Sequence, residues 1–259
     1  MNADWEPQYD EEFKMKQNKY DESAFFDKYS RMERSKRGLE GAGEWHELRK
    51  MLPDFQGKRV LDLGCGFGWH CRFAEENGAR EVVGIDISQK MLNKAKEKAY
   101  SEHIRYVCMP IEDIDFPGDS FDVVISSLAF HYLSSFEGIV NKISQCLTHG
   151  GDLVFSVEHP VYTAQGKQDW YYDLQGDSLH WPVDHYFSEG QRRSIFSGEE
   201  VVKYHRTLTT YVNSLMKAGF EITGLVEPKP TENMLRNVPG MLEELRRPMM
   251  LLVSARKKK

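Results

Sequence analysis

Residues 60–70 of the chain read VLDLGCGFGWH, and this stretch decides the fold. An apolar run that ends at Leu63 predicts a buried strand, and Gly64, Gly66 and Gly68 follow it at two-residue spacing. Glycines let the backbone turn tightly and approach a ligand, and the start of a following helix offers unpaired N–H groups. The stretch therefore predicts a strand, a turn and a helix that together hold a polar or anionic ligand group.

The residues around the turn narrow the choice of ligand. A phosphate-binding loop needs Lys and then Ser or Thr after its last glycine, but Trp69 and His70 stand there. A dinucleotide fingerprint needs its third glycine at the position that Trp69 occupies. Asp86, at the end of the next strand, suits a ribose diol, as found for both NAD and S-adenosylmethionine. The glycine register and Asp62, before the turn, must decide between these two ligands.

Seven apolar, β-branched segments alternate with helical ones, which is typical of a mainly parallel sheet covered on both faces. We predict an α/β fold with a doubly wound, seven-stranded sheet. The expected strands are residues 59–64, 81–86, 104–109, 121–126, 152–157, 220–227 and 249–255. The expected helices between them are residues 69–77, 89–100, 136–146 and 208–217.

Two segments interrupt this alternation. The first is an amino-terminal helical cap, with helices expected over residues 22–37 and 44–51. The second is an aromatic-rich insertion after the fifth strand, of the kind that often forms a lid or a binding loop. The alternative is a hydrophobic cluster that only packs on the sheet. We predict four parts: a cap (1–56), a cofactor-binding core (57–160), a lid or substrate insertion (161–206) and the remainder of the core (207–259).

Composition disfavours several classes of function. A net charge of −6 does not indicate a basic surface for phosphates, so nucleic acid is disfavoured as a partner. The four cysteines show no CxxC pair and no zinc-type spacing with histidine, so we expect ordinary thiols and no bound metal. The amino terminus is too polar for a signal peptide, and no stretch approaches the roughly 20 apolar residues that span a bilayer. We therefore expect a cytoplasmic protein that does not contact the membrane, and the oligomeric state stays open.

With these residues in place, the sequence resembles the class I S-adenosylmethionine-dependent methyltransferases. It is most similar to their broad small-molecule group (methyltransferase type 11, ubiquinone-biosynthesis-like). Five motifs in order carry the resemblance: the D-x-G-x-G-x-G turn, residues 84–88, residues 111–122, residues 126–132 and Gly150-Gly151. The resemblance implies a Rossmann-like methyltransferase fold and an enzyme that takes its methyl group from S-adenosylmethionine.

The resemblance also implies roles for individual residues. The turn glycines would pass under the methionine and ribose portions of the donor, and Asp62 would hold the methionine amino group. Asp86 would take both ribose hydroxyls, while Ile87 and Ile111 would sandwich the adenine. Many relatives carry an aspartate just before Ile111, where this chain has a proline, so adenine recognition would depend on backbone groups or on the acids that follow. The expected cofactor-binding residues are Asp62, Gly64, Cys65, Gly66, Gly68, Asp86, Ile87, Ile111, Glu112, Ser127 and Tyr29.

Methyl transfer from a sulfonium depends more on placement than on covalent help, so a conspicuous catalytic residue is not required. Three histidines are candidate bases: His131 after the fourth strand, His159 after the fifth, and His205 at the end of the insertion. Each could deprotonate an acceptor hydroxyl, and each could equally be a structural histidine. The aromatic insertion favours a small, partly aromatic or apolar acceptor that is methylated on oxygen or nitrogen.

Three other functions remain open at this stage. One is methylation of a macromolecule such as tRNA or a protein side chain. Another is a non-catalytic protein that binds S-adenosylmethionine but lacks an acceptor cavity. An NAD-dependent oxidoreductase comes last, because the glycine register is shifted by one position.

Overall fold

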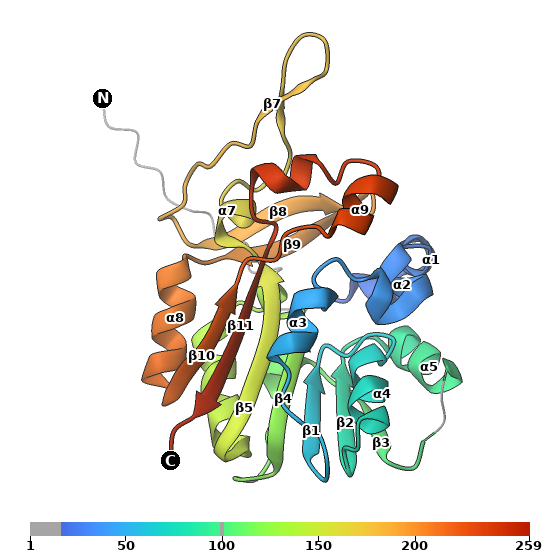
Figure 1. The fold of residues 1–259 in the computed structure, drawn as a ribbon, viewed down its shortest axis with the longest axis vertical. Coiled ribbons are helices and arrows are strands. Elements are labelled where there is room, and N and C mark those ends of the chain that lie inside the picture. The colour runs from blue at the N-terminus through green and yellow to red at the C-terminus, as the bar shows by residue number, and fades with distance from the viewer. Residues whose placement is uncertain (1–16, 99–100) are drawn as a thin grey trace.

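A seven-stranded sheet forms the centre of the computed structural model, which describes residues 17–98 and 101–259 (Figure 1). The strand order is β10-β11-β5-β4-β1-β2-β3. Strands β1 to β5 run parallel, whereas β11 is antiparallel to both of its neighbours. The bounds are β1 (Arg59–Leu63), β2 (Glu81–Asp86), β3 (Ile104–Cys108), β4 (Phe121–Ser127), β5 (Leu147–Glu158), β10 (Phe220–Val226) and β11 (Met250–Lys257). The predicted doubly wound, mainly parallel α/β sheet is confirmed.

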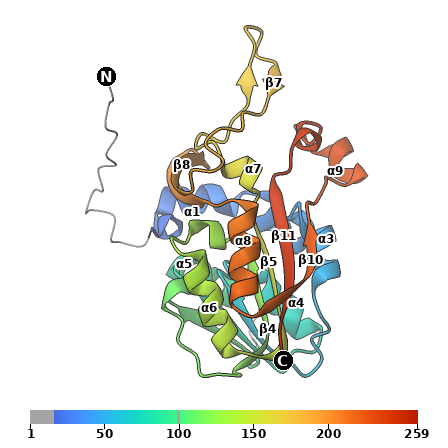
Figure 2. The same ribbon diagram turned by 90° about the vertical axis from the view of Figure 1, so that its left-hand side faces the viewer.

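Helices cover both faces of this sheet. On one face, α6 (Phe136–Cys146) and α8 (Leu208–Lys217) lie side by side (Figure 2) and pack on Leu61 and Val124. On the other face, α4 (Trp69–Glu76) and α5 (Gln89–Lys98) pack on Val60 and Val123. Because side chains alternate along a strand, the even-numbered residues of β1 and the odd-numbered residues of β4 face α4. The end of the expected helix at residues 99–100 lies outside the described residues.

The cap is more broken than the sequence predicts. It consists of the α-helices α1 (Ser23–Ser30), α2 (Glu33–Arg37) and α3 (Trp45–Met51). Two 3₁₀-helices, which are labelled η, also belong to it: η2 (Lys19–Asp21) and η3 (Gly38–Gly41). The expected helix over residues 22–37 is split because Met32 has an extended backbone with φ −66° and ψ 150°. The first part of the predicted cap, residues 1–16, lies outside the described residues, and so does most of the amino terminus judged too polar for a signal peptide.

The insertion forms a short helix and two β-hairpins. Helix α7 (Pro160–Thr163) follows β5, and then come the hairpin β6 (Tyr171–Tyr172) with β7 (Ser178–His180) and the hairpin β8 (Gly190–Phe196) with β9 (Glu199–His205). The β6–β7 hairpin projects from the body of the molecule in both views, whereas β8–β9 lies across the end of the sheet (Figures 1 and 2). The two hairpins are therefore placed for different tasks.

Three further features differ from the prediction or add to it. Strand β5 begins at Leu147 rather than at residue 152, because Leu147 pairs with Phe121 before a shift in register. Helix α9 (Glu232–Asn237) and the turn η6 (Glu243–Arg246) stand between β10 and β11, where the sequence predicts no element. No helix in the described part of the chain is long and apolar enough to cross a membrane.

Candidate active site

The glycine turn joins β1 to α4 at the carboxyl ends of the parallel strands. Gly64, Gly66 and Gly68 have φ values of +76°, +51° and +70°, a region that other L-residues rarely adopt. A Cβ on Gly64 would lie 2.5 Å from Cβ of Ala129, whereas a Cβ on Gly66 would meet no atom within 4 Å. The turn is thus tightly packed at its first glycine and open at its second.

Asp86 at the end of β2 closes this turn from the side. Its Oδ2 accepts the backbone N–H of Gly66 at 2.9 Å, and its Oδ1 accepts that of Ser88 at 2.9 Å. Burial raises the pKa of Asp86 to about 6, although these two N–H groups oppose the rise. Each carboxylate oxygen keeps further acceptor capacity, because such an oxygen can accept two hydrogen bonds. Asp86 is therefore held ready to receive two more donors.

The expected adenine contacts lie beside Gly64. Ile111 is buried in the turn η4 (Ile111–Asp113), and its Cδ1 would be 3.4 Å from a Cβ on Gly64. Ile87 is half-buried, and its carbonyl accepts Nδ2 of Asn18 at 3.2 Å. The backbone carbonyl of Glu112 accepts Nζ of Lys142 at 2.6 Å. These residues come from the two loops that follow β2 and β3, at the same end of the sheet as the glycine turn.

Asp62 lies under the turn, on the face of the sheet that α4 covers. It is 1% exposed, and burial raises the pKa of its carboxyl to about 7. Its Oδ2 accepts Sγ of Cys71 at 3.2 Å, while Oδ1 has no hydrogen-bond partner among the described residues. Cys65 is also buried and packs close to Cys71, and burial raises the pKa of its thiol to about 11. An unpaired buried carboxylate oxygen is rare in native proteins and indicates a ligand donor.

The cap packs directly on the turn. Tyr29 of α1 contacts the ring of Phe67 edge to face, with 5.9 Å between centroids, and it also contacts Tyr20 at 5.2 Å. Asp21 of η2 accepts Oγ of Ser88 at 2.6 Å and the backbone N–H of Lys90 at 3.0 Å. Although burial opposes it, these hydrogen bonds lower the pKa of Asp21. The cap thus holds the loop that follows Asp86.

An ion pair within the cap, between the partly exposed Arg34 and the buried Glu44, is hydrogen-bonded to the end of β4. Glu44 is 1% exposed, and its Oε1 contacts Nη2 of Arg34 at 2.6 Å and accepts Oγ of Ser127 at 3.2 Å. Burial alone would raise the pKa of Glu44, but the Arg34 guanidinium lowers it below its usual range. Sequence reasoning missed Arg34 and Glu44, because charged residues occur throughout the cap and nothing in their spacing marks these two.

The three candidate histidines are buried, and burial lowers the pKa of each one, to about 4 for His131. His159 accepts the N–H of Val161 on Nδ1 at 3.0 Å and lies 2.9 Å from Oε1 of Glu227 through Nε2. His205 contacts Oγ1 of Thr163 through Nδ1 and the carbonyl of Tyr186 through Nε2, both at 2.8 Å. Both ring nitrogens of His205 thus have hydrogen-bond contacts, whereas His159 accepts a hydrogen bond on Nδ1 and has a close contact with a carboxylate at Nε2.

His131 differs because the structure records a partner for one ring nitrogen. The backbone N–H of Glu158 donates to its Nδ1 at 3.4 Å, so the neutral ring carries its proton on Nε2. With a pKa near 4, the ring is neutral around pH 7. His131 can therefore donate a hydrogen bond through Nε2, but this nitrogen is not free to accept a proton.

The hairpin β8–β9 meets the cap above the sheet. The rings of Phe196 and Phe25 lie 6.0 Å apart, and Glu199 pairs with Lys28 at 3.3 Å. Beneath this contact, Nζ of Lys203 in β9 binds Oε1 of Glu158 at 2.6 Å. Both covers therefore close over the carboxyl ends of β4 and β5.

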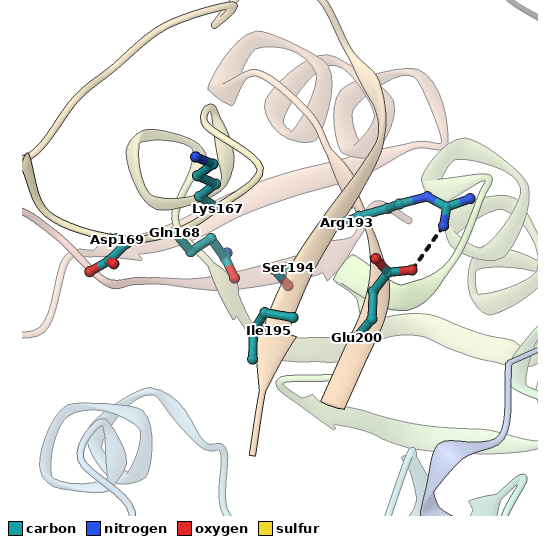
Figure 3. Close-up of a pocket in the computed structure, with 7 residues that line it drawn as sticks. All are labelled: Lys167, Gln168, Asp169, Arg193, Ser194, Ile195 and Glu200. Atoms are coloured by element: carbon teal, nitrogen blue, oxygen red, sulfur yellow. Dashed lines mark hydrogen bonds and ion pairs between the residues drawn. The ribbon is translucent and has the colours of Figure 1, made fainter. Parts of the chain in front are cut away.

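A pocket of about 420 Å³ opens between this hairpin and the loop before β6 (Figure 3). Arg193 and Glu200, both on its wall, pair at 2.8 Å. The full lining is Lys167, Gln168, Asp169, Arg193, Ser194, Ile195 and Glu200. None of these residues belongs to the glycine turn, so this pocket is distinct from the site around Asp62 and Asp86. Among residues 17–98 and 101–259, no group of His, Cys, Asp and Glu side chains is arranged to hold a metal ion.

Comparison with known proteins identifies the family. A family model described as a methyltransferase domain matches residues 61–155, which contain the glycine turn. A Listeria monocytogenes structure assigned to the S-adenosylmethionine-dependent methyltransferases is 55% identical to this chain, covers 86% of it and 100% of its own chain, and superposes with a TM-score of 0.82. The chain belongs to the class I S-adenosylmethionine-dependent methyltransferases. A methyltransferase structure from Mesorhizobium loti is 43% identical, covers 85% of this chain and 100% of its own, and has a TM-score of 0.77.

Two relatives of stated acceptor match about half of this methyltransferase, and another relative matches nearly all of it. A Haemophilus influenzae protein of no stated function is 33% identical over 92% of this chain and 96% of its own length. A malonyl-[acyl-carrier protein] O-methyltransferase of Enterobacter lignolyticus is 34% identical over 48% of each chain. A tRNA U34 carboxymethyltransferase of Hahella chejuensis is 34% identical over 53% of this chain and 47% of its own. The chain thus spans about half the length of these two relatives, whose acceptors differ in class.

Three observations indicate that the residues of this methyltransferase can hold S-adenosylmethionine. Asp62 has an unpaired buried oxygen, Gly66 leaves open space above the turn, and Asp86 keeps acceptor capacity on both oxygens. When bound, S-adenosylmethionine supplies a methyl group that its positive sulfur has already activated. The protein therefore has to bind, orient and shield the reactants from water rather than form a covalent bond.

Proposed function

We propose that this methyltransferase transfers the methyl group to an oxygen or nitrogen atom of a small, partly aromatic or apolar molecule. The observation that carries the proposal is the contact between the two covers, where Phe196 meets Phe25 and Glu199 meets Lys28. Covers that touch above the carboxyl ends of β4 and β5 would separate the space next to the donor from solvent. An enclosed space with aromatic walls suits a small molecule better than a macromolecular surface.

The charge of the projecting hairpin supports the same choice. Residues 169–180 contain three aspartates and neither lysine nor arginine. Arg246 and Arg247 pack against this hairpin, but they pair with Glu243 and Glu244, so these two cations are already neutralised. Exposed aromatic residues such as Tyr171 can stack on nucleic acid bases, but binding of a polyanion also needs cations along the same surface. We therefore consider a small molecule a better candidate for the acceptor than tRNA.

For the donor, we propose that Asp86 receives the ribose hydroxyls and that Asp62 receives the methionine ammonium group. The glycine turn would pass under the donor, and Ile87 and Ile111 would hold the adenine with Glu112 nearby. Tyr29 would cover the donor from the cap, and Ser127 would lie at its methionine end. Cys65 would contribute its backbone rather than its thiol, because the thiol is buried and protonated.

For the reaction, we propose that no histidine acts as a base. Both ring nitrogens of His205 are hydrogen-bonded, Nδ1 of His159 is hydrogen-bonded while its Nε2 lies 2.9 Å from Oε1 of Glu227, and His131 presents a proton on Nε2. His131 would then orient the acceptor by donating a hydrogen bond. The acceptor would need a lone pair that is nucleophilic without deprotonation by a histidine, as an amine or a readily ionised hydroxyl provides. Of the four parts into which we divide the chain, the insertion at residues 161–206 would serve as the lid over the substrate.

Labelled S-adenosylmethionine tests the acceptor class. The purified protein is incubated with the methyl-labelled donor and with a metabolite extract, total tRNA or a protein extract in separate reactions. We expect a labelled small product from the metabolite extract only. Asp86→Asn is the matched inactive control, since it keeps the size of the side chain but removes its charge. Label in tRNA or protein, and none in a small product, would contradict the proposal.

A further inference from the structure

The buried carboxylate of Glu44 has one oxygen that nothing in the described part of the chain satisfies. Oε1 is engaged by Arg34 and Ser127, but Oε2 is buried and has no hydrogen-bond partner among the described residues. Leaving such a charged oxygen unpaired is costly, and a buried ion pair rarely repays its own desolvation. A role in stability alone therefore explains the pair poorly.

The position of Glu44 indicates what it faces. Ser127 is the last residue of β4, an odd-numbered position, so it shares the α4 face of the sheet with Asp62 of β1. On this face Nε2 of His70, in the first turn of α4, is also buried without a recorded partner. The field of Glu44 reaches His70, which places the carboxylate beside the helix that follows the glycine turn. Unpaired polar atoms from the cap, β1 and α4 thus lie on one face of the sheet, at the end that carries the glycine turn.

We propose that Arg34 and Glu44 bind the α-amino-acid end of the methyl donor, with the guanidinium on its carboxylate and Oε2 of Glu44 on its ammonium group. This zwitterion carries the two charges that the pair can complement. Arg34 keeps N–H donors beyond the one that binds Glu44, because a guanidinium has five. Asp62 then shares the ammonium group with Glu44, so residues of the cap and of the sheet both bind the donor. The inference rests on the proposed placement of the donor along the turn.

Two ligands that differ only at this end provide the test. S-adenosylhomocysteine carries the amino-acid zwitterion, whereas 5′-methylthioadenosine keeps the adenosine and sulfur but lacks it. Calorimetry on the full chain measures both ligands with the wild type, Glu44→Gln and Arg34→Lys. We expect each variant to bind S-adenosylhomocysteine about 10- to 100-fold more weakly and 5′-methylthioadenosine within about twofold of the wild type.

The control is Arg37→Ala, which removes an exposed cation from the same helix α2 and should leave both affinities unchanged. Equal losses for the two ligands, or no loss for S-adenosylhomocysteine in both variants, would overturn the inference. Arg34→Lys keeps the charge, so it gives an answer even if Glu44→Gln does not fold. If the wild type itself failed to bind S-adenosylhomocysteine, the placement of the donor would be wrong, which is a separate result.

Discussion

The glycine turn and the insertion at residues 161–206 solve different problems in the same site. In the turn, three glycines with positive φ bring the backbone to the ligand, and Asp86 is fixed by two backbone N–H groups. In the insertion, side chains extend into solvent, and Leu174 and Phe187 are 100% and 91% exposed. The turn is thus built from backbone geometry and the insertion from side chains.

This difference explains why the ligand turn can be recognised from the sequence whereas the molecule under the cover cannot. A backbone that must take a left-handed conformation admits few residue types, so the turn is recognisable in many proteins. A cover that only has to be apolar and closed admits many sequences, so its residues reveal little about the molecule that it covers. The predictions below test this contrast, from the largest expected effect to the smallest.

Lys203→Ala asks whether the insertion depends on one buried contact. Lys203 is 2% exposed and pairs with Glu158, so its removal leaves a buried carboxylate without its cation. We expect the free energy of unfolding to fall by about 3–5 kcal/mol in chemical denaturation. Lys167→Ala, an exposed lysine of the same insertion, should change it by less than about 0.5 kcal/mol. Equal effects of the two changes would show that β9 is not anchored in this way.

Asp86→Ala removes the carboxylate that we assign to the ribose. We expect S-adenosylhomocysteine to bind about 100-fold more weakly in calorimetry, because two hydrogen bonds to a charged group are lost. Asp122→Ala is the matched control, since Asp122 pairs with Arg59 at the start of β4 and β1, far from the turn. Unchanged affinity in Asp86→Ala would remove the ribose assignment.

Alanine substitutions at three glycines separate strain from close contact. A Cβ added at Gly150 would meet no atom within 4 Å. Gly150→Ala should therefore lower the free energy of unfolding only through the strain of the positive φ, by about 1–2 kcal/mol. Gly64→Ala adds a clash with Ala129 and should cost about 1 kcal/mol more in thermal unfolding. Gly66→Ala should resemble Gly150→Ala in stability but weaken S-adenosylhomocysteine binding, because the donor would occupy its open space. A Gly66→Ala protein that binds normally would contradict this placement.

The raised pKa values of Asp62 and Asp86 lead us to expect opposite effects of pH on ligand binding and on stability. Burial raises the pKa of Asp62 to about 7 and of Asp86 to about 6, above the unfolded value near 4. Their contribution to stability is therefore fully present below about pH 4 and is lost as pH rises through 6 and 7. S-adenosylhomocysteine needs both carboxylates ionised, so its affinity should rise several-fold from pH 5.5 to 8 in calorimetry. Asp62→Asn should reduce the slope of both curves and leave the part that Asp86 contributes, and an affinity that falls with pH would contradict the roles of both acids.

Leu174→Ser should have the smallest effect. Leu174 is fully exposed at the tip of the β6–β7 hairpin, so its loss removes no packing, and the unfolding free energy should change by less than about 0.5 kcal/mol. Leu251→Ala in β11, where the side chain is buried, should cost about 2–5 kcal/mol. A large effect of Leu174→Ser would mean that the tip is covered in solution.

The sheet could be predicted from the sequence because each buried strand is an apolar run with glycines or helix caps at its ends. Other features could not. No local pattern in the sequence marks the break of the helix at Met32, and the ion pair between Arg34 and Glu44 joins two segments that meet only in the folded chain. In the hairpin β8–β9 burial alternates along each strand, but the residue types do not follow it, since Ile195 points outward while Ser194 and Lys203 are buried. Polar residues inside and apolar ones outside obscure the period of two on which strand prediction depends.

Asp21 gives the cap a kinetic consequence. Its carboxylate binds Oγ of Ser88 and the N–H of Lys90, so the first turn of α5 is capped by a residue from a distant part of the chain. Opening of the cap would remove this acceptor from the Lys90 N–H, while Ser88 would still accept the N–H of Met91. Hydrogen exchange at the Lys90 amide, compared with exchange at the Met91 amide, should consequently report how often the cap opens.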